Sequence, residues 1–360
     1  MEVVDLAIVG AGPTGSSCAA FAARAGLRVV VIEREKFPRE KVCGDCLNPS
    51  CWPVLRRLEI TDRVRELPHG KLDAVEFIAI GGAKVHVDLP RGENSEIAIK
   101  RSLFDELLLN RTRELGVTIR DQTIVSAIHK ERWGDWKIDI VHDVVRAKVL
   151  VAADGRNSTI ARLRNLLPKP QRERVALQSH IPLPDNFGDR VVLQFLPQGY
   201  SGQAPVNDRE LNVCLVGRPH SIADLKTWAE KYFGVSPSHP WRTITPLTRA
   251  PIAPAQENLF FIGDAARVVE PFTGEGIYYA LRSGELAANA IVDLARGQDR
   301  QSTLRGFTRA HAQMYRGRLW INQLARAAVL SPRIASTFVR VAKFQPSLLR
   351  LLTSKIVDTP

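Results

Sequence analysis

Apolar runs and turn residues follow one another along the first part of the chain in the order strand, turn, helix, strand. Residues 3–9 form an apolar run that ends in the segment GAGPTG at 10–15, and an alanine-rich stretch continues to about residue 24. A second apolar run, LRVVVIE, covers residues 27–33. Short apolar runs bounded by glycine are typical of buried strands, so this pattern predicts a parallel βαβ unit.

Two later apolar runs also end in a turn that carries an aspartate. Residues 147–158, AKVLVAADGRNS, lead into Asp154 and Gly155. Residues 259–277, LFFIGDAARVVEPFTGEGI, lead into Gly263 and Asp264 and then into a predicted long helix. Ligands of open α/β sheets bind at the carboxyl ends of the strands. The sequence therefore predicts an α/β fold with a Rossmann-type domain and a ligand at this edge of its sheet.

The last sixty residues combine helical periodicity with positive charge. Apolar positions recur at helical spacing (307, 310, 311 and 314, then 321, 324, 325 and 328), Ser331-Pro332 ends this helical pattern, and a second apolar segment follows. Residues 301–360 hold ten basic side chains and one acidic one, out of a net charge of +12. Basic amphipathic helices suit an anionic membrane surface, and the alternative is a solvated face packed on the main body. No nucleic-acid partner is expected, because no aromatic-and-basic recognition motif accompanies the charge.

The composition sets limits on the class of protein. A chain of 360 residues with 45 % hydrophobic and 24 % charged residues predicts about two globular domains. Its five cysteines are too few and too clustered for a disulfide framework, which favours a reducing compartment. No apolar run reaches about 18 residues, the usual minimum for a membrane span. The expected location is cytoplasmic, with possible peripheral contact at the inner membrane face.

The GAGPTG segment has the residues that a dinucleotide pyrophosphate needs. Gly10 permits the tight turn, Gly12 lets the backbone approach the phosphates, and Gly15 lets the helix pack closely on the sheet. The N-terminus of the helix presents unpaired N–H groups to the phosphates. Glu33, at the end of the second strand, is suited to the ribose hydroxyls, and an acid there disfavours a 2′-phosphate.

The two later turns favour a flavin over a nicotinamide. Asp264 is suited to a hydroxyl of a ribityl chain, which only a flavin has. Residues 274–276 would bring backbone N–H groups against the pyrimidine edge of an isoalloxazine ring. The dipole of the helix that follows would favour the anionic reduced ring.

These three motifs, in this order, resemble the FAD domain of the p-hydroxybenzoate hydroxylase superfamily. Within that superfamily, REKFPREKVCGDCLNP (34–49) and TGEGIYYALRSGELAA (273–288) are similar to the geranylgeranyl reductase branch. The resemblance covers residues 1–60, 97–165 and 245–297. It implies FAD as cofactor and a discontinuous FAD-binding domain over 1–65, 97–165 and 246–300. Besides the residues above, it implies these cofactor contacts: Pro13, Thr14, Arg34, Cys46, Arg101, Asp154, Gly155, Gly263, Pro271, Gly274, Glu275, Gly276 and Ile277.

The resemblance also implies an inserted antiparallel-sheet substrate domain, over residues 66–96 and 166–245. Strand-like runs there include AVEFIAI, RVVLQFL and ELNVCLVG. A Tyr-x-Trp-x-Phe-Pro stretch is usual in the branch, and this chain has Tyr200 and Pro205 with Gly202 and Ala204 between them. The small residues open space beside the flavin. Tyr200 is the candidate acid–base or orienting group, and His180 is interpreted as a structural histidine.

Cys43 and Cys46 form a CxxC pair just after the second strand. Cys43 is expected to line the active site, since the branch places a cysteine near the flavin. A redox pair is the alternative. No metal is expected, because no second pair completes a zinc site. Cys18 and Cys214 are interpreted as core residues.

Three functions share this scaffold. The first is reduction of a double bond in a hydrophobic isoprenoid, lipid or polyketide-like substrate through reduced flavin. The second is a flavin monooxygenase that hydroxylates a phenolic or lipidic substrate. The third is an electron carrier to quinone at a membrane surface. No second GxGxxG motif is present, so NAD(P)H is expected at most as a transient reductant.

Overall fold

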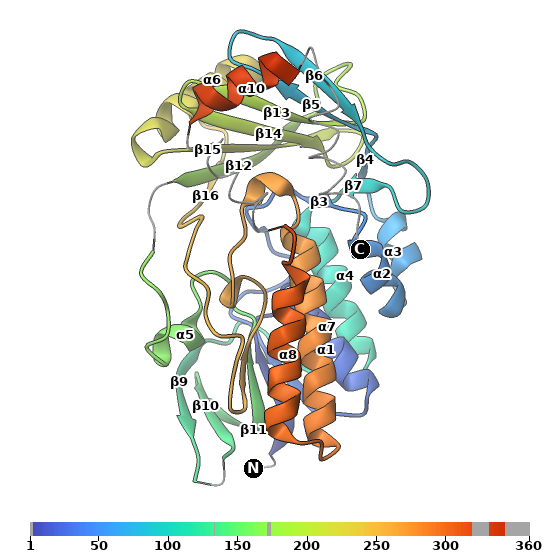
Figure 1. Ribbon diagram of the computed structural model, residues 1–360, viewed down its shortest axis with the longest axis vertical. Coiled ribbons are helices and arrows are strands. Elements are labelled where there is room, and N and C mark those ends of the chain that lie inside the picture. The colour runs from blue at the N-terminus through green and yellow to red at the C-terminus, as the bar shows by residue number, and fades with distance from the viewer. Residues whose placement is uncertain (1–2, 133, 171–173, 319–330, 343–360) are drawn as a thin grey trace.

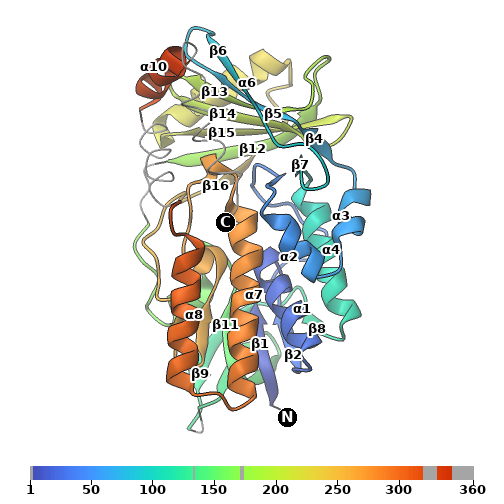
Figure 2. The ribbon, with the colours of Figure 1, turned by 45° about the vertical axis from the view of Figure 1, so that its right-hand side comes forward.

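The computed structural model describes residues 3–132, 134–170, 174–318 and 331–342. The chain forms an elongated α/β molecule with one sheet toward each end (Figures 1 and 2). The N-terminal strand lies in the same end of the molecule as the longest helix, residues 276–295. This arrangement agrees with the predicted fold class, a Rossmann-type domain with an additional sheet.

The first sheet has a parallel centre that brings the predicted turns together. Its strand order is β17-β18-β11-β1-β2-β8, and β10 and β9 continue from β11 as antiparallel strands. In this register Val9 lies beside both Ile32 and Ala152, so the glycine turn and Glu33 are at one edge with Asp154. The strands are β1 (Val4–Val9), β2 (Val29–Ile32), β8 (Thr118–Arg120), β9 (Val125–Lys130), β10 (Trp136–Ile140), β11 (Asp143–Ala152), β17 (Ala255–Gln256) and β18 (Leu259–Phe261).

Small buried side chains let two helices pack closely on this sheet. Cys18, Ala19 and Ala22 of α1 (Pro13–Arg24) belong to the same buried core as Ala287 and Ala288 of α7 (Gly276–Ala295). The helix α8 (Arg300–Met314) packs beside α7. The predicted inward positions 307 and 311 of α8 are buried. The other helices of this end are α2 (Cys51–Arg57), α3 (Thr61–Glu66), α4 (Arg101–Glu114) and α5 (Thr159–Leu163).

The second sheet has seven strands in the order β16-β12-β15-β14-β13-β5-β6. The three predicted strand-like runs are strands of this sheet. Its members are β5 (Ala74–Ile78), β6 (Lys84–Asp88), β12 (Val175–Pro182), β13 (Arg190–Leu196), β14 (Gly199–Pro205), β15 (Glu210–Gly217) and β16 (Arg242–Ile244). A three-stranded sheet of β3 (Cys46–Leu47), β7 (Glu96–Ala98) and β4 (Gly70–Leu72) lies where the two ends of the molecule meet (Figure 1).

Side chains alternate between the two faces of the second sheet. On β15, Val213 and Leu215 pack with α6 (Ile222–Phe233), whereas Cys214 and Val216 face the other way and line a cavity. The face that α6 leaves open therefore points toward the turns of the first sheet. This alternation is the period-2 pattern of a sheet covered on both sides.

The C-terminal helix α10 (Pro332–Ala342) packs on β5, β6 and β13. Ala335 and Val339 of this helix are buried in the core of the second sheet. The predicted helical positions 321, 324, 325 and 328, and the apolar residues 348–352, lie outside the described residues. Within the described ranges, no helix is long and apolar enough to cross a membrane.

Candidate functional site

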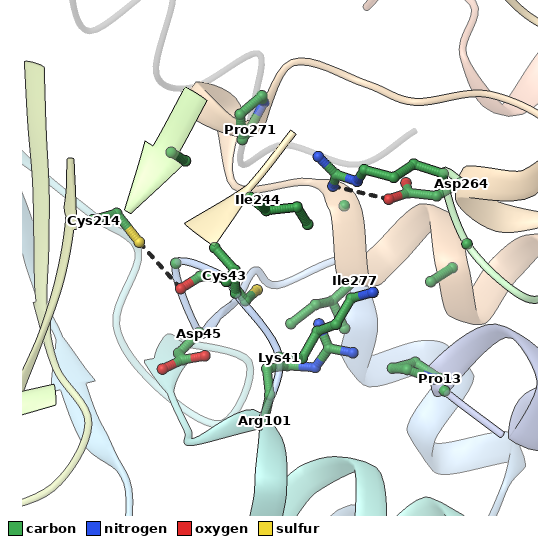
Figure 3. Close-up of a pocket in the computed structure, with 18 of the residues that line it drawn as sticks. Pro13, Lys41, Cys43, Asp45, Arg101, Cys214, Ile244, Asp264, Pro271 and Ile277 are labelled. Carbon is green, nitrogen blue, oxygen red and sulfur yellow. Dashed lines mark hydrogen bonds and ion pairs between the residues drawn. The ribbon is translucent and has the colours of Figure 1, made fainter. Parts of the chain in front are cut away.

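One cavity of about 590 Å³ joins the glycine turn of the first sheet to the open face of the second sheet. In Figure 3, Pro13 and Asp264 lie on one side of this cavity, and Cys214 and Asp45 lie on the other. The cavity is lined by 17 of the 20 predicted site residues. Those at or near the carboxyl edge of the first sheet are Gly10, Gly12, Pro13, Thr14, Glu33, Arg34, Arg101, Asp154, Gly155 and Asp264. The carboxyl edge of the sheet is thus continuous with an apolar wall.

The glycine turn is closed so tightly that two of its positions exclude a side chain. Gly10 has φ +104°, and a Cβ there would lie 2.5 Å from the carbonyl oxygen of Ala153. A Cβ on Gly15 would lie 1.8 Å from the carbonyl oxygen of Gly10. Gly15 is therefore needed for the contact between α1 and the turn, as the sequence predicts.

The start of α1 and the carboxylate of Glu33 form the part that suits an adenosine diphosphate group. No side chain caps α1 at Gly12, so its first N–H groups are available to an anion. The carboxylate of Glu33 accepts hydrogen bonds from the backbone N–H of Ala11 at 2.7 Å and of Glu35 at 2.9 Å. These bonds hold the buried carboxylate at the edge of the cavity.

Five cationic side chains line the same part of the cavity, which suits the two phosphates of a dinucleotide: Arg34, Arg39, Lys41, Arg101 and Arg156. Asp105 positions two of them. Its carboxylate accepts two hydrogen bonds from Arg101, at 2.7 and 2.8 Å, and lies 3.1 Å from Arg39. Burial, together with the nearby Arg156 and Arg101, lowers the pKa of Lys41 to about 8.

The two predicted aspartates have partners within the protein. Asp264 lies 3.0 Å from the guanidinium of Arg156 (Figure 3). One oxygen of Asp154 accepts hydrogen bonds from the backbone N–H of Thr159 and Ile160 at the start of α5. Its other oxygen is buried and has no partner in the described part of the chain. Burial raises the pKa of Asp154.

In the motif at residues 273–277, the glycines face the cavity, whereas the side chain of Glu275 points away from it. Gly274, Gly276 and Ile277 line the cavity together with Pro271. The carboxylate of Glu275 is not part of the lining. It is buried, and it accepts hydrogen bonds from the hydroxyl of Tyr279 at 3.1 Å and from Arg318. The predicted contact of Glu275 with the cofactor stays a prediction, and its side chain ties α7 to the chain after α8. Gly15 and Gly263 also do not line the cavity. Gly15 packs against Gly10, and Gly263 packs against Thr14.

The wall on the other side of the cavity is apolar and aromatic. Tyr200 is buried on β14, and its ring meets the ring of Phe272 edge-on with centroids 5.3 Å apart. Burial raises the pKa of Tyr200 above its ordinary value, so the phenol is neutral at physiological pH. A neutral phenol at this place can orient a ligand by a hydrogen bond.

Three cysteines, Cys43, Cys46 and Cys214, line the cavity beside Tyr200, all as free thiols. Burial raises the pKa of each thiol. Thiol–disulfide exchange needs the thiolate, so this environment favours Cys43 as a wall residue over the redox alternative. Cys214, which the sequence places in the core, donates a hydrogen bond to the carbonyl oxygen of Cys43 at 3.2 Å (Figure 3). In the described ranges no cluster of three or more potential ligands could hold a metal ion.

Several residues of the site were not predicted individually. Arg39 and Lys41 lie in the REKFPREKVCGDCLNP segment and Arg156 lies in ADGRNS, so the motifs contained them without showing their roles. For Asp105, the only indication in the sequence of a role at the site was its spacing of four residues from Arg101 on a predicted helix, which lets the two side chains pair. Glu96, from the small sheet, also lines the cavity, and burial raises the pKa of its carboxyl group to about 7.

Comparison with known proteins agrees with this arrangement. The model of the FAD binding domain family matches residues 3–178. A menaquinone reductase of Mycobacterium tuberculosis (strain ATCC 25618 / H37Rv) is 30 % identical over 330 residues, which cover 82 % of this chain and 78 % of that protein. A digeranylgeranylglycerophospholipid reductase of Thermoplasma volcanium is 25 % identical over 85 % of this chain and 82 % of its own length.

Two further matches show how much of this chain resembles other proteins in sequence and in fold. Conditioned medium factor receptor 1 of Dictyostelium discoideum is 26 % identical over 83 % of this chain, and the match spans 65 % of that longer protein. The solved structure of PqsL, a probable FAD-dependent monooxygenase from Pseudomonas aeruginosa, superposes with a TM-score of 0.79 at 18 % identity. That match covers 94 % of this chain and 100 % of the other, and it shows the fold alone.

The donor set at the first sheet fits FAD. The uncapped start of α1 and the cations suit the two phosphates, Glu33 suits the adenosine ribose, and the continuation of the cavity past Asp264 leaves room for a group beyond the phosphates. A nicotinamide dehydrogenase would need only the first of the three turns. FAD is the cofactor, and the chain belongs to the FAD-dependent oxidoreductases of the p-hydroxybenzoate hydroxylase superfamily.

Proposed function

We propose that this oxidoreductase reduces carbon–carbon double bonds in a hydrophobic substrate of isoprenoid or lipid type. The observation that carries the proposal is the apolar wall that continues directly from the cofactor site. This wall is formed by the open face of the second sheet, from Val75, Phe77, Ala176, Val191, Leu193, Ala204 and Val216. The names of the relatives, a menaquinone reductase and a digeranylgeranylglycerophospholipid reductase, support a substrate with a long apolar part.

Small residues on β14 give this wall its depth. Gly202 and Ala204 both line the cavity, and a Cβ on Gly202 would make only an ordinary contact, 3.6 Å from Leu193. A bulky side chain at either position would project into the cavity. The space suits a chain or ring that extends away from the flavin.

The residues around the cavity support a hydride-transfer reaction. FAD, when reduced and bound, supplies a hydride ion. Tyr200 and Phe272 add aromatic surface to the cavity wall, and Tyr200 can orient the substrate as a neutral hydrogen-bond donor. The cations around Arg101 favour the negative charge of a reduced flavin.

The test is a single-turnover reaction under anaerobic conditions. The FAD-loaded protein is reduced with dithionite and mixed with detergent-solubilised menaquinone or digeranylgeranylglycerophospholipid. We expect one double bond to be reduced for each flavin reoxidised, as measured by the product mass and the flavin absorbance. Gly202→Trp, which fills the apolar part and leaves the glycine turn intact, should retain FAD and lose at least about tenfold in rate. In a parallel reaction with oxygen admitted, hydroxylated product formed with one oxygen molecule consumed would instead support the monooxygenase alternative.

We also propose that the substrate is reached from a membrane surface through α10. Three large apolar side chains of this helix are exposed, Ile334 by 70 %, Phe338 by 41 % and Val341 by 56 %. They are spaced by four and three residues, so they share one face, and the exposed Arg333 and Arg340 flank them. An apolar stripe with basic neighbours suits insertion at the boundary of an anionic lipid layer.

Serine at positions 334, 338 and 341 together should weaken binding to phosphatidylglycerol vesicles by about tenfold or more, because burying one such side chain contributes about 1.5–3 kcal/mol. Vesicle co-sedimentation measures this. Tyr232→Ser, which removes an exposed aromatic ring from α6, is the matched control and should change nothing. Deletion of α10 is unsuitable, since Ala335 and Val339 are buried in the core. Equal binding of the triple variant and the wild type would refute the membrane contact.

A further inference from the structure

A buried acid–histidine pair borders the cavity and has no role in the function described so far. The carboxylate oxygen Oδ2 of Asp45 lies 2.7 Å from Nε2 of His180 on β12. Only 1 % of the Asp45 side chain and 8 % of the His180 side chain are exposed. Asp45 lines the cavity between Cys43 and Cys46, and its backbone has φ +62°, which is uncommon for a residue other than glycine.

A chain of amide groups runs from the backbone of Cys43 to this pair. Asn212 donates a hydrogen bond from Nδ2 to the carbonyl oxygen of Cys43 at 2.8 Å, so its Oδ1 must face Gln178. Gln178 therefore directs its amide nitrogen, Nε2, at this oxygen, 3.0 Å away. The same nitrogen lies 3.3 Å from Nε2 of His180.

The short contact between Oδ2 of Asp45 and Nε2 of His180 has one proton between the two atoms. We assign this proton to the imidazole, which donates to Oδ2. A neutral carboxyl group of Asp45 then carries its own proton on Oδ1.

The second oxygen of the carboxyl group, Oδ1, is buried and has no hydrogen-bond partner among the described residues. Buried polar atoms without a partner are rare in proteins and point to a missing ligand or a chemical role. Since Asp45 lines the cavity, a substrate there is the ligand that can meet this oxygen.

The charges around Asp45 agree with a neutral acid. Burial raises its pKa, and Glu40 acts in the same direction. His180 and Arg101 act in the opposite direction and do not cancel the effect of burial. The neighbouring thiols of Cys43, Cys46 and Cys214 are neutral, as argued above. The charge of Glu210, on the neighbouring strand β15, also interacts with His180, and Glu210 pairs with Lys100 at 2.6 Å.

We propose that Asp45 is the general acid of the reaction and that His180 positions its carboxyl group. The inference rests on the proposed reduction of a double bond. One carbon of the bond gains a hydride ion from reduced FAD, which is thereby oxidised, and the other carbon gains the proton that Oδ1 of Asp45 carries. The carboxylate left behind takes up a proton from solvent after the product leaves the cavity. The net change is one double bond reduced, one flavin oxidised and one proton consumed.

The first test replaces Asp45 by asparagine in the FAD-loaded protein. The oxygen of the asparagine amide can accept from His180 as the carboxyl oxygen does, so the fold and the flavin spectrum should be retained, but the amide is not acidic enough to transfer a proton. We expect the single-turnover rate to fall about 10²- to 10⁴-fold, the usual contribution of a general acid. Infrared difference spectra between wild type and variant should show the C=O stretching band of a protonated carboxyl group lost in the variant at neutral pH, with or without substrate.

The second test uses His180. Because Asp45 acts in its protonated form, the wild-type rate should fall as the pH rises through the pKa of Asp45. His180→Gln removes the group that lowers this pKa, so the alkaline limb of the pH–rate profile should move to higher pH. The matched control is His239→Gln. His239 contacts Ser179, the neighbour of His180 that faces away from the cavity, and its replacement should leave the profile unchanged.

The outcomes separate the inference from the function. A variant Asp45→Asn that reduces the double bond at the wild-type rate, or that loses no carboxyl band, would overturn the role of Asp45. A wild-type protein that reduces neither lipid would overturn the proposed function. In that case, a carboxyl band lost in Asp45→Asn would still support a protonated acid at the cavity wall.

Discussion

Replacing Gly15 by alanine should leave a folded protein that no longer retains FAD through purification. The added Cβ would lie 1.8 Å from the carbonyl oxygen of Gly10, so α1 must move away from the turn that receives the phosphates. Overpacking of this kind costs about 1–3 kcal/mol, and 3 kcal/mol corresponds to roughly a hundredfold in affinity. Titration of the apoprotein with FAD, followed by flavin fluorescence, measures the dissociation constant.

Gly306→Ala is the control for this experiment. Gly306 lies inside α8, and a Cβ there would meet nothing within 4 Å. Alanine is the better helix former by about 0.5–1 kcal/mol, so this variant should be as stable as the wild type or slightly more stable, with the same affinity for FAD. Wild-type affinity in Gly15→Ala would mean that the turn does not hold the phosphates.

A large loss of stability is expected when Asp105 is replaced. This residue is fully buried, and its carboxylate pairs with both Arg101 and Arg39. Asp105→Asn removes the negative charge and leaves two guanidinium groups at the cavity without their counter-ion. Breaking a buried ion pair from one side costs about 3–5 kcal/mol. We expect a decrease of that size in the free energy of unfolding of the apoprotein, measured by urea titration.

The matched control for Asp105 is Asp62→Asn. Asp62 pairs with Arg65 at 3.7 Å, and its side chain is 91 % exposed. An exposed pair contributes about 1 kcal/mol or less, so this variant should unfold close to the wild-type midpoint. If both variants are equally stable, Asp105 does not hold the two arginines in the folded protein.

The cofactor half of the site could be predicted because its chemistry is local in the sequence. Gly10, Gly12 and Gly15 occupy one turn, and Asp154 and Asp264 each follow an apolar run directly. Parallel strands bring such ends together without any knowledge of long-range contacts. Glu33 was predictable for the same reason, since it ends the second strand.

The substrate half depends on contacts between distant segments, which periodicity cannot reveal. His180 meets Asp45 across 135 residues, and Asn212 meets Cys43 across 169 residues. Considered by itself, a histidine in a strand-like stretch is most simply a structural residue. The sequence also could not show that the side chain of Glu275 points away from the cavity, because its partner Arg318 lies 43 residues further along the chain.

The continuity of the cavity has a consequence for the order in which ligands enter. Among the described residues, no wall separates the glycine turn from the apolar face, so in the apoprotein a lipid or detergent tail has an open path toward the place of the adenosine group. FAD must then bind first, because an acyl chain already inside the cavity competes with it. Reconstitution should succeed in detergent-free buffer and become progressively slower as micelles are added.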